Sequence, residues 1–183
     1  MRILKNIWSQ LHRFLLWALL SSVFWAWIFG MVTNTAPQHK VVLYADVEEC
    51  RDRELTLKLE EEKPESIRMI KVHPFSYAMF DDGELQSSDL YVVSASKAEQ
   101  YLESFAPLDE GNRDFGDREL YRVEGVSYGV KIYDAASGSG AAKTYLGYEE
   151  DEDYYLFFNA ASPHLEDGDG AALRVAETLL KLD

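Results

Sequence analysis

Six residues able to contact a ligand lie at the ends of three segments expected to be strands. These strands cover residues 40–45, 66–73 and 89–93, and in an open α/β sheet ligands bind beyond the carboxyl ends of the strands. The candidate ligand-binding residues at this edge are Asp46, His73, Ser76, Tyr77, Ser94 and Ser96. They supply a carboxylate, hydroxyls and aromatic rings, which suit the orientation of a small polar solute. The alternative is that Tyr77 belongs to the core and that Ser94 and Ser96 only cap a helix.

No set of residues has the spacing of a catalytic site. The segment SGSGAAKT (Ser137–Thr144) is similar to a phosphate-binding loop, but Ser137 and Ala142 occupy its two glycine positions and a strand is expected beyond it. Cys50 is the only cysteine, and nothing in the sequence links it to a histidine base. We therefore predict no catalytic residue and expect that the protein is not an enzyme.

Three further patterns are weak as metal sites. Asp167–Gly170 begins like a calcium loop, but Ala171 stands where the third ligand belongs, so a turn and a helix cap explain it better. The acidic run Glu149–Asp153 is typical of a solvated loop tip, with weak binding of a divalent ion as the alternative. His73 and His164 have no chelating spacing. No metal and no cofactor is predicted.

A membrane anchor is predicted near the N-terminus. Phe14–Val32 has nineteen residues without a charge, and as a helix it reaches roughly 28 Å, close to the ~30 Å hydrocarbon core of a bilayer. Trp25 and Trp27 lie near its outer end, where an interfacial belt places tryptophan. The alternative is a cleaved signal peptide, but the only small-x-small site, Asn34–Ala36, is followed by Pro37.

The charges around the span predict its orientation. Arg2, Lys5 and Arg13 precede it, and no acidic residue occurs before Asp46. Positive flanks stay on the cytoplasmic side, so we expect a single-pass protein of the cell membrane with its C-terminal domain outside. The expected parts are a cytoplasmic leader (1–13), the transmembrane signal anchor (14–32), a tether (33–39) and an extracytoplasmic domain (40–183).

The exterior domain is strongly acidic. It carries all 32 acidic residues of the chain against 15 of its 18 lysines and arginines, which leaves a formal charge of −17. Such a surface argues against binding to nucleic acid or to an anionic membrane surface. Solubility is the simplest explanation of the charge, and cationic ligands are the alternative. The single cysteine excludes a disulfide framework.

The first half of the domain alternates strands and helices. Between the three strands named above we expect a helix within 46–62 and a short helix at 75–80, although the alternation of Leu55, Leu57 and Leu59 also permits a strand. Ser96 to Glu99 has the pattern of a capping box and predicts a helix up to Phe105. This order implies right-handed crossovers and a mixed, mainly parallel sheet flanked by helices.

The second half of the domain has a different pattern. We expect an irregular loop over 108–124, an amphipathic strand over 126–133 and a flexible connection over 135–142. Two more strands are expected at 143–148 and 154–159, and a closing helix capped by Asp169 with a buried stripe of Ala172, Val175, Ala176, Leu179 and Leu180.

Three segments resemble extracellular solute-binding proteins, most of all small membrane-anchored bacterial relatives of that family. They are Asp89–Leu108, Tyr128–Asp134 and Asp153–Leu180. The resemblance implies a periplasmic-binding-protein-like α/β lobe that captures a solute for an importer. Two features depart from the family pattern: the domain has length for about one lobe, and all four tryptophans precede it.

Two functions are compatible with these observations. The first is a membrane-anchored, non-catalytic module that binds or senses a small polar solute, alone or with a transporter. The second is a degenerate binding-protein lobe that acts as a protein-interaction or assembly module in the cell envelope. A response to a small solute separates them, because only the first function predicts one.

Overall fold

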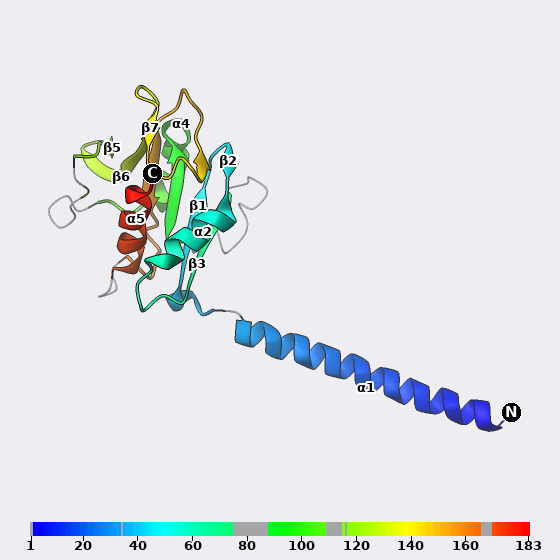
Figure 1. Ribbon diagram of the computed structural model, residues 1–183. Coiled ribbons are helices and arrows are strands. Elements are labelled where there is room, and N and C mark those ends of the chain that lie inside the picture. Colours follow the sequence, from blue (N-terminus) through cyan, green and yellow to red (C-terminus); the bar gives the residue numbers. More distant parts are fainter. Residues whose placement is uncertain (1, 34, 75–87, 109–114, 116, 166–169) are drawn as a thin grey trace. The chain divides into compact units, whose positions relative to one another are not determined.

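The computed structural model describes residues 2–33, 35–74, 88–108, 115, 117–165 and 170–183. It consists of two compact units, Met1–Ala36 and Pro37–Asp183 (Figure 1). The expected helix at 75–80, with the candidate residues Ser76 and Tyr77, lies outside the described residues, as does the predicted cap Asp169.

The first unit is one long helix, α1 (Arg2–Thr33). Its stretch Gln10–Gly30 is long and apolar enough to cross a membrane, and none of it is buried inside the protein. Large side chains such as Phe14 and Trp17 are about 70% exposed (71% and 69%), which water disfavours and lipid accepts. The hydroxyl of Ser22 donates to the Ala18 carbonyl at 2.8 Å and so needs no water. The helix is therefore consistent with a single-pass anchor.

The second unit is built on a mixed sheet. Its strands lie in the order β3 (Met69–Pro74), β1 (Lys40–Ala45), β4 (Leu90–Ser94), β9 (Tyr154–Phe158), β6 (Val126–Asp134) and β5 (Leu120–Val123), with β7 (Ser139–Gly140) paired to β6. β1 pairs in parallel with β3 and β4 on its two sides. The predicted strand over 40–45 is confirmed, and its continuous apolar run reflects burial on both faces.

The parallel pairing is confined to β3, β1 and β4. β9 and β6 continue the sheet in antiparallel order, as do β5 and β7. The sheet is thus mixed, as predicted. In its second half every strand pairing is antiparallel, and β5 and β6 form a hairpin. Glu124 and Gly125 at its turn both have positive φ (52° and 84°), the geometry of a tight turn that matches strand twist.

Two predictions for the second half of the domain are wrong. Residues 120–123, expected in an irregular loop, form β5 because they find a partner in β6. The expected strand over 143–148 is reduced to β8 (Leu146–Gly147), which pairs with β2 (Glu49–Cys50) in a small second sheet. Both outcomes depend on pairing between segments that are distant in the sequence, and the local periodicity of one segment does not reveal its partner.

Helices cover the two faces of the main sheet (Figure 1). α2 (Asp52–Glu61) and α5 (Ala171–Lys181) pack on one face through Leu55, Leu59 and the predicted stripe of α5. α4 (Ala95–Ala98) and the 3-10 helix η3 (Glu99–Ser104) lie on the other face. The expected capping box is wrong, because no side-chain capping hydrogen bond forms and α4 is a single turn.

The second face is an aromatic layer under η3. Phe105 stacks on Phe157 with ring centroids 4.1 Å apart, and Tyr91 lies 5.6 Å from Phe105. Gly129 of β6 faces this layer, and a Cβ atom at that position would stand 2.6 Å from Phe157 Cε1. The absence of a side chain at residue 129 therefore allows β6 and β9 to pair.

We predict that Gly129→Ala lowers the free energy of unfolding by about 1–3 kcal/mol, because the stacked ring of Phe157 has no room to move away. Urea unfolding followed by tyrosine near-ultraviolet circular dichroism measures it, since all four tryptophans lie in α1. Val126→Ala on the same strand is the control, because Val126 is 41% exposed and the expected change is within about 0.5 kcal/mol. Equal effects of the two variants would contradict the prediction.

Candidate functional site

The carboxyl ends of β1 and β4 form a topological switch point. The chain leaves β1 towards α2 on one face of the sheet and leaves the neighbouring β4 towards α4 and η3 on the other face. Connections that diverge in this way open a crevice at the ends of the two strands. We call the group Asp46, Ser94, Ser96, Lys97 and Glu152 the switch-point edge.

An ion pair joins the two sides of the switch-point edge. Lys97 Nζ lies 3.1 Å from both carboxylate oxygens of Asp46. The two side chains are only 15% (Asp46) and 33% (Lys97) exposed, so the pair is screened less than one on the open surface. The backbone amide of Asp46 donates to the Val92 carbonyl at 2.8 Å, which holds the carboxylate beside β4.

A chain of hydrogen bonds completes the switch-point edge. Ser94 and Ser96 lie with their hydroxyl oxygens 3.1 Å apart, and Ser96 Oγ is 2.7 and 2.9 Å from the two carboxylate oxygens of Glu152. Hydrogen bonds from Ser96 and then Ser94 hold the pKa of the Glu152 carboxyl below its usual range. The carboxylate is thus bound in its charged form, and it links the segment before β9 to the end of β4.

His73 lies apart from the switch-point edge, on the far side of β1. It is opposite Tyr44 in the register of β1 and β3, and the two rings are 5.3 Å apart. His73 Nε2 is buried without a hydrogen-bond partner among the described residues. The structure therefore brings together Asp46, Ser94 and Ser96 of the predicted site, and it adds Lys97 and Glu152.

Sequence reasoning missed these two added residues for different reasons. Lys97 lies within the segment interpreted as a capping box, and Glu152 lies within the run interpreted as a solvated acidic tip. Glu152 lies 56 residues from the serine it binds, and four other acidic residues stand next to it in sequence. Nothing in the local pattern distinguishes it from them.

A buried polar network lies at the amino end of β4. Asp89 is 1% exposed; its carboxylate accepts hydrogen bonds from the Val42 amide at 2.8 Å and from the Ser162 hydroxyl at 2.5 Å. Burial raises the pKa of Asp89 despite these bonds. His164 Nε2 lies 3.0 Å from the Pro37 carbonyl, to which it donates. Because Ser162 gives its proton to Asp89 and not to an imidazole, the set lacks the geometry of a hydrolase triad.

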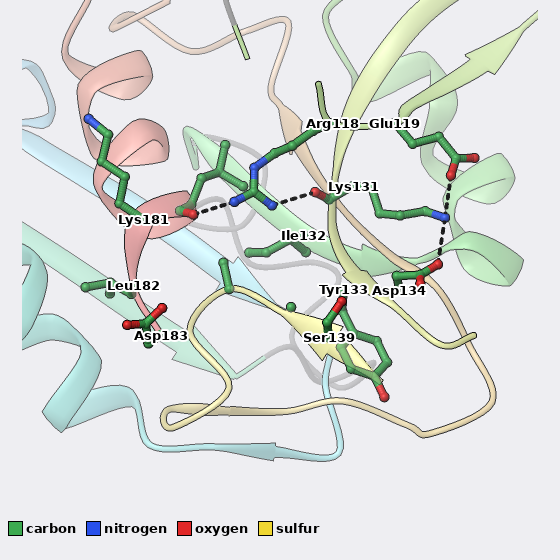
Figure 2. Close-up of a pocket in the computed structure, with 13 residues that line it drawn as sticks. Arg118, Glu119, Lys131, Ile132, Tyr133, Asp134, Ser139, Lys181, Leu182 and Asp183 are labelled. Carbon is green, nitrogen blue, oxygen red and sulfur yellow. Dashed lines mark hydrogen bonds and ion pairs between the residues drawn. The ribbon is translucent and has the colours of Figure 1, made fainter. Parts of the chain in front are cut away.

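A groove of about 540 Å³ lies between the ends of β6, β7 and α5 (Figure 2). At its centre Arg118 donates to the Leu180 carbonyl at 2.7 Å and to the Lys131 carbonyl at 3.5 Å. The first bond satisfies a carbonyl of the last turn of α5, which has no partner within the helix. Arg118 thereby ties α5 to the sheet.

Lys131 is the centre of a charge cluster beside the groove (Figure 2). Its ammonium lies 2.6 Å from Glu119, 2.8 Å from Asp153 and 3.3 Å from Asp134. Burial works against the charge of Lys131, but hydrogen bonds to Asp153 and Glu119 outweigh it and raise the pKa of the ammonium. The lysine therefore stays charged and holds three segments of the acidic domain together.

In the part of the chain that the structure describes, the side chains form neither an activated nucleophile nor a metal centre. Burial, and then the neighbouring Asp52, raise the pKa of the Cys50 thiol to about 11, so the thiolate is scarce at neutral pH. No group of three His, Cys, Asp or Glu side chains among the described residues is arranged to hold a metal ion. The switch-point edge has instead the hydroxyls and paired charges of a binding site.

Comparisons with known proteins leave the family open. No model of a known family matches the sequence, and no curated protein matches it. The resemblance to solute-binding proteins therefore stays a prediction, and so does the assignment of the second unit to a periplasmic-binding-protein-like lobe.

We predict that Lys131→Met lowers the free energy of unfolding by about 1–2 kcal/mol at pH 7, because three carboxylates then face one another without a counter-charge. Hydrogen bonds from Ser137, and then Lys131, hold the pKa of Asp134 below its usual value. The stability that its charge contributes is present at neutral pH and is lost as the pH falls. The difference between variant and wild type should therefore narrow below about pH 4.

Urea unfolding at several pH values measures this difference. Lys58→Met is the matched control, since Lys58 forms one exposed surface pair with Glu61 and such pairs contribute little. If the free energy of unfolding lost in Lys131→Met stays constant from neutral pH to well below the lowered pKa of Asp134, the lost packing of the side chain, and not the charge, is responsible.

Proposed function

We propose that this protein is a membrane-anchored extracytoplasmic module that binds or senses a small polar solute without catalysing a reaction, alone or with a transporter. Two properties support the location outside the cytoplasm. The bases of the chain that precede the apolar stretch are Arg2, Lys5 and Arg13, and the domain beyond it is acidic. Positive residues are retained on the cytoplasmic side during membrane insertion.

The observation that carries the binding function is the polar composition of the switch-point edge. It combines an ammonium, two hydroxyls and two carboxylates between loops that leave the sheet in opposite directions. Groups of both charge signs that are partly exposed and already oriented can bind a polar solute at a low cost in side-chain entropy. One lobe covers only one side of such a solute, so we expect weak binding unless a partner covers the other side.

A second candidate function is a protein-interaction or assembly module of the cell envelope. The observation in its favour is that the charged groups of the switch-point edge already have partners, since Asp46 pairs with Lys97 and Glu152 accepts from the Ser96 hydroxyl. A solute must replace these contacts, whereas a partner protein needs only an accessible surface. The groove beside Arg118, which has charges of both signs on its rim, offers one.

The orientation can be tested with single cysteines in a Cys50→Ala background. We expect Ser104→Cys, at an exposed position of η3, to react with a membrane-impermeant maleimide in intact cells. Ser9→Cys in the leader should react only after lysis. The reverse pattern would contradict the proposed orientation, and a mature product that lacks residue 9 would contradict the anchor.

The binding function can be tested by thermal unfolding of the full-length protein in nanodiscs with a panel of sugars, amino acids, carboxylates and amines. We expect at least one solute to raise the melting temperature, since a ligand at 100 times its Kd stabilises by about 2.7 kcal/mol. Lys97→Met should abolish that response, and Lys58→Met, on an exposed face of α2, should retain it. No response to any solute, together with a protein partner that co-purifies in detergent, would favour the second function.

A further inference from the structure

The groups at the end of β4 are hydrogen-bond donors directed at carboxylates. Ser96 donates its hydroxyl proton to Glu152, and Ser94, whose Oγ lies 3.1 Å from Ser96 Oγ, also hydrogen-bonds to this carboxylate. Lys97 donates to Asp46. Each donor is thus bound to a carboxylate from a different part of the chain.

We propose that Glu152 is a tethered competitor that occupies the place of a ligand carboxylate at the switch-point edge. This inference rests on the proposed solute-binding function and adds to it the class of ligand, a small solute with a carboxylate group. The carboxylate of Glu152 marks where the ligand carboxylate binds, between the hydroxyls of Ser94 and Ser96 and next to Lys97.

The hydrogen-bond chain supports a carboxylate as the ligand. Ser94 is 1% exposed; its Oγ lies 3.1 Å from Ser96 Oγ, and hydrogen bonds from both serines hold the pKa of the Glu152 carboxyl low. Such a chain is strengthened when it ends on a charged acceptor. A cation in the same place would meet the protons of both hydroxyls and the ammonium of Lys97, so the local groups disfavour it.

The contact of Glu152 is weak enough to be displaced. The hydroxyl of Ser96 lies at the exposed surface, where water competes for both partners. A group held by a short flexible segment has an effective concentration in the mM range, so a free carboxylate competes only when it is abundant or makes further contacts. Ala95 N donates to the Asp153 carbonyl at 2.8 Å, so the segment stays attached when the side chain of Glu152 leaves.

The negative charge of the domain does not exclude an anionic ligand. The formal charge of −17 is spread over the exterior part of the chain, and charges farther than about 8 Å away are largely screened at physiological ionic strength. Contacts with Ser96 and Lys97 act within that distance, and so does repulsion from Asp46 and from the acidic residues next to Glu152 in the chain. Because salt screens the remaining repulsion, the affinity for a carboxylate should rise slightly as the ionic strength increases. The affinity for a surface-bound cation should fall under the same change.

The test compares Glu152→Ala with Glu150→Ala in the full-length protein. Both variants remove one glutamate from the same acidic loop, but Glu150 is exposed and has no role at the edge. The probe is acetate, titrated while the amide resonances of Ser96 and Lys97 are followed by NMR in detergent micelles. We expect Glu152→Ala to bind acetate at least about tenfold more tightly than Glu150→Ala or wild type, because it lacks the tethered competitor.

Further variants test whether Ser96 and Glu152 compete for the same place. If Glu152→Ala fails to fold, Glu152→Gln replaces it and should show a smaller gain, because its amide oxygen still accepts from Ser96. Adding Ser96→Ala to Glu152→Ala should remove the gain. Acetate affinities equal in Glu152→Ala and Glu150→Ala would overturn the inference and show that Glu152 only braces α4.

The results for this inference and for the proposed function can be separated. A solute that stabilises wild type, combined with no gain in acetate affinity on removal of Glu152, overturns the inference alone. A gain in Glu152→Ala, combined with no solute that stabilises wild type, supports the inference and contradicts the proposed function of the intact protein.

Discussion

The structure of the domain depends on the complete burial of β1. Residues 41–45 are at most 1% exposed, so every backbone donor and acceptor of the strand needs a partner inside the protein. β3 and β4 supply most of these partners on its two sides, both in parallel orientation, and the Asp89 carboxylate accepts from the Val42 amide. Parallel neighbours require crossover connections, and the connections after β1 and β4 cover opposite faces of the sheet. The position of the switch-point edge follows from this arrangement.

Basic residues hold the acidic domain together at a few places. Lys97 of α4 joins the segment after β1. Lys131 of β6 joins the residues directly before β5 and β9 through carboxylates, and Arg118 joins α5 to β6. With 32 acidic residues against 15 basic ones, random placement would leave most of the acidic groups repelling each other. Placing single cations between several carboxylates gives each cation more favourable contacts than one surface pair provides.

Local sequence patterns predicted much of the fold. The apolar stretch of α1, the run of β1, the alternation of β6 and the stripe of α5 were recognised because burial imposes a period on neighbouring residues. Asp46, Ser94 and Ser96 were placed at one edge by the rule for parallel strands alone. The same reasoning failed at β5 and at residues 143–148, where a partner strand elsewhere in the chain decides the structure.

The sequence by itself determined the apolar N-terminal helix, the acidic character of the domain and the edge of the sheet where polar residues gather, because composition and periodicity are local properties. Only the tertiary structure decided which polar side chains come into contact. The contact of Ser96 with Glu152 spans 56 residues and the contact of Lys97 with Asp46 spans 51. The physical reason is that such contacts form after the strands have paired, so they depend on the register and direction of the whole sheet and not on the residues beside each group in the chain.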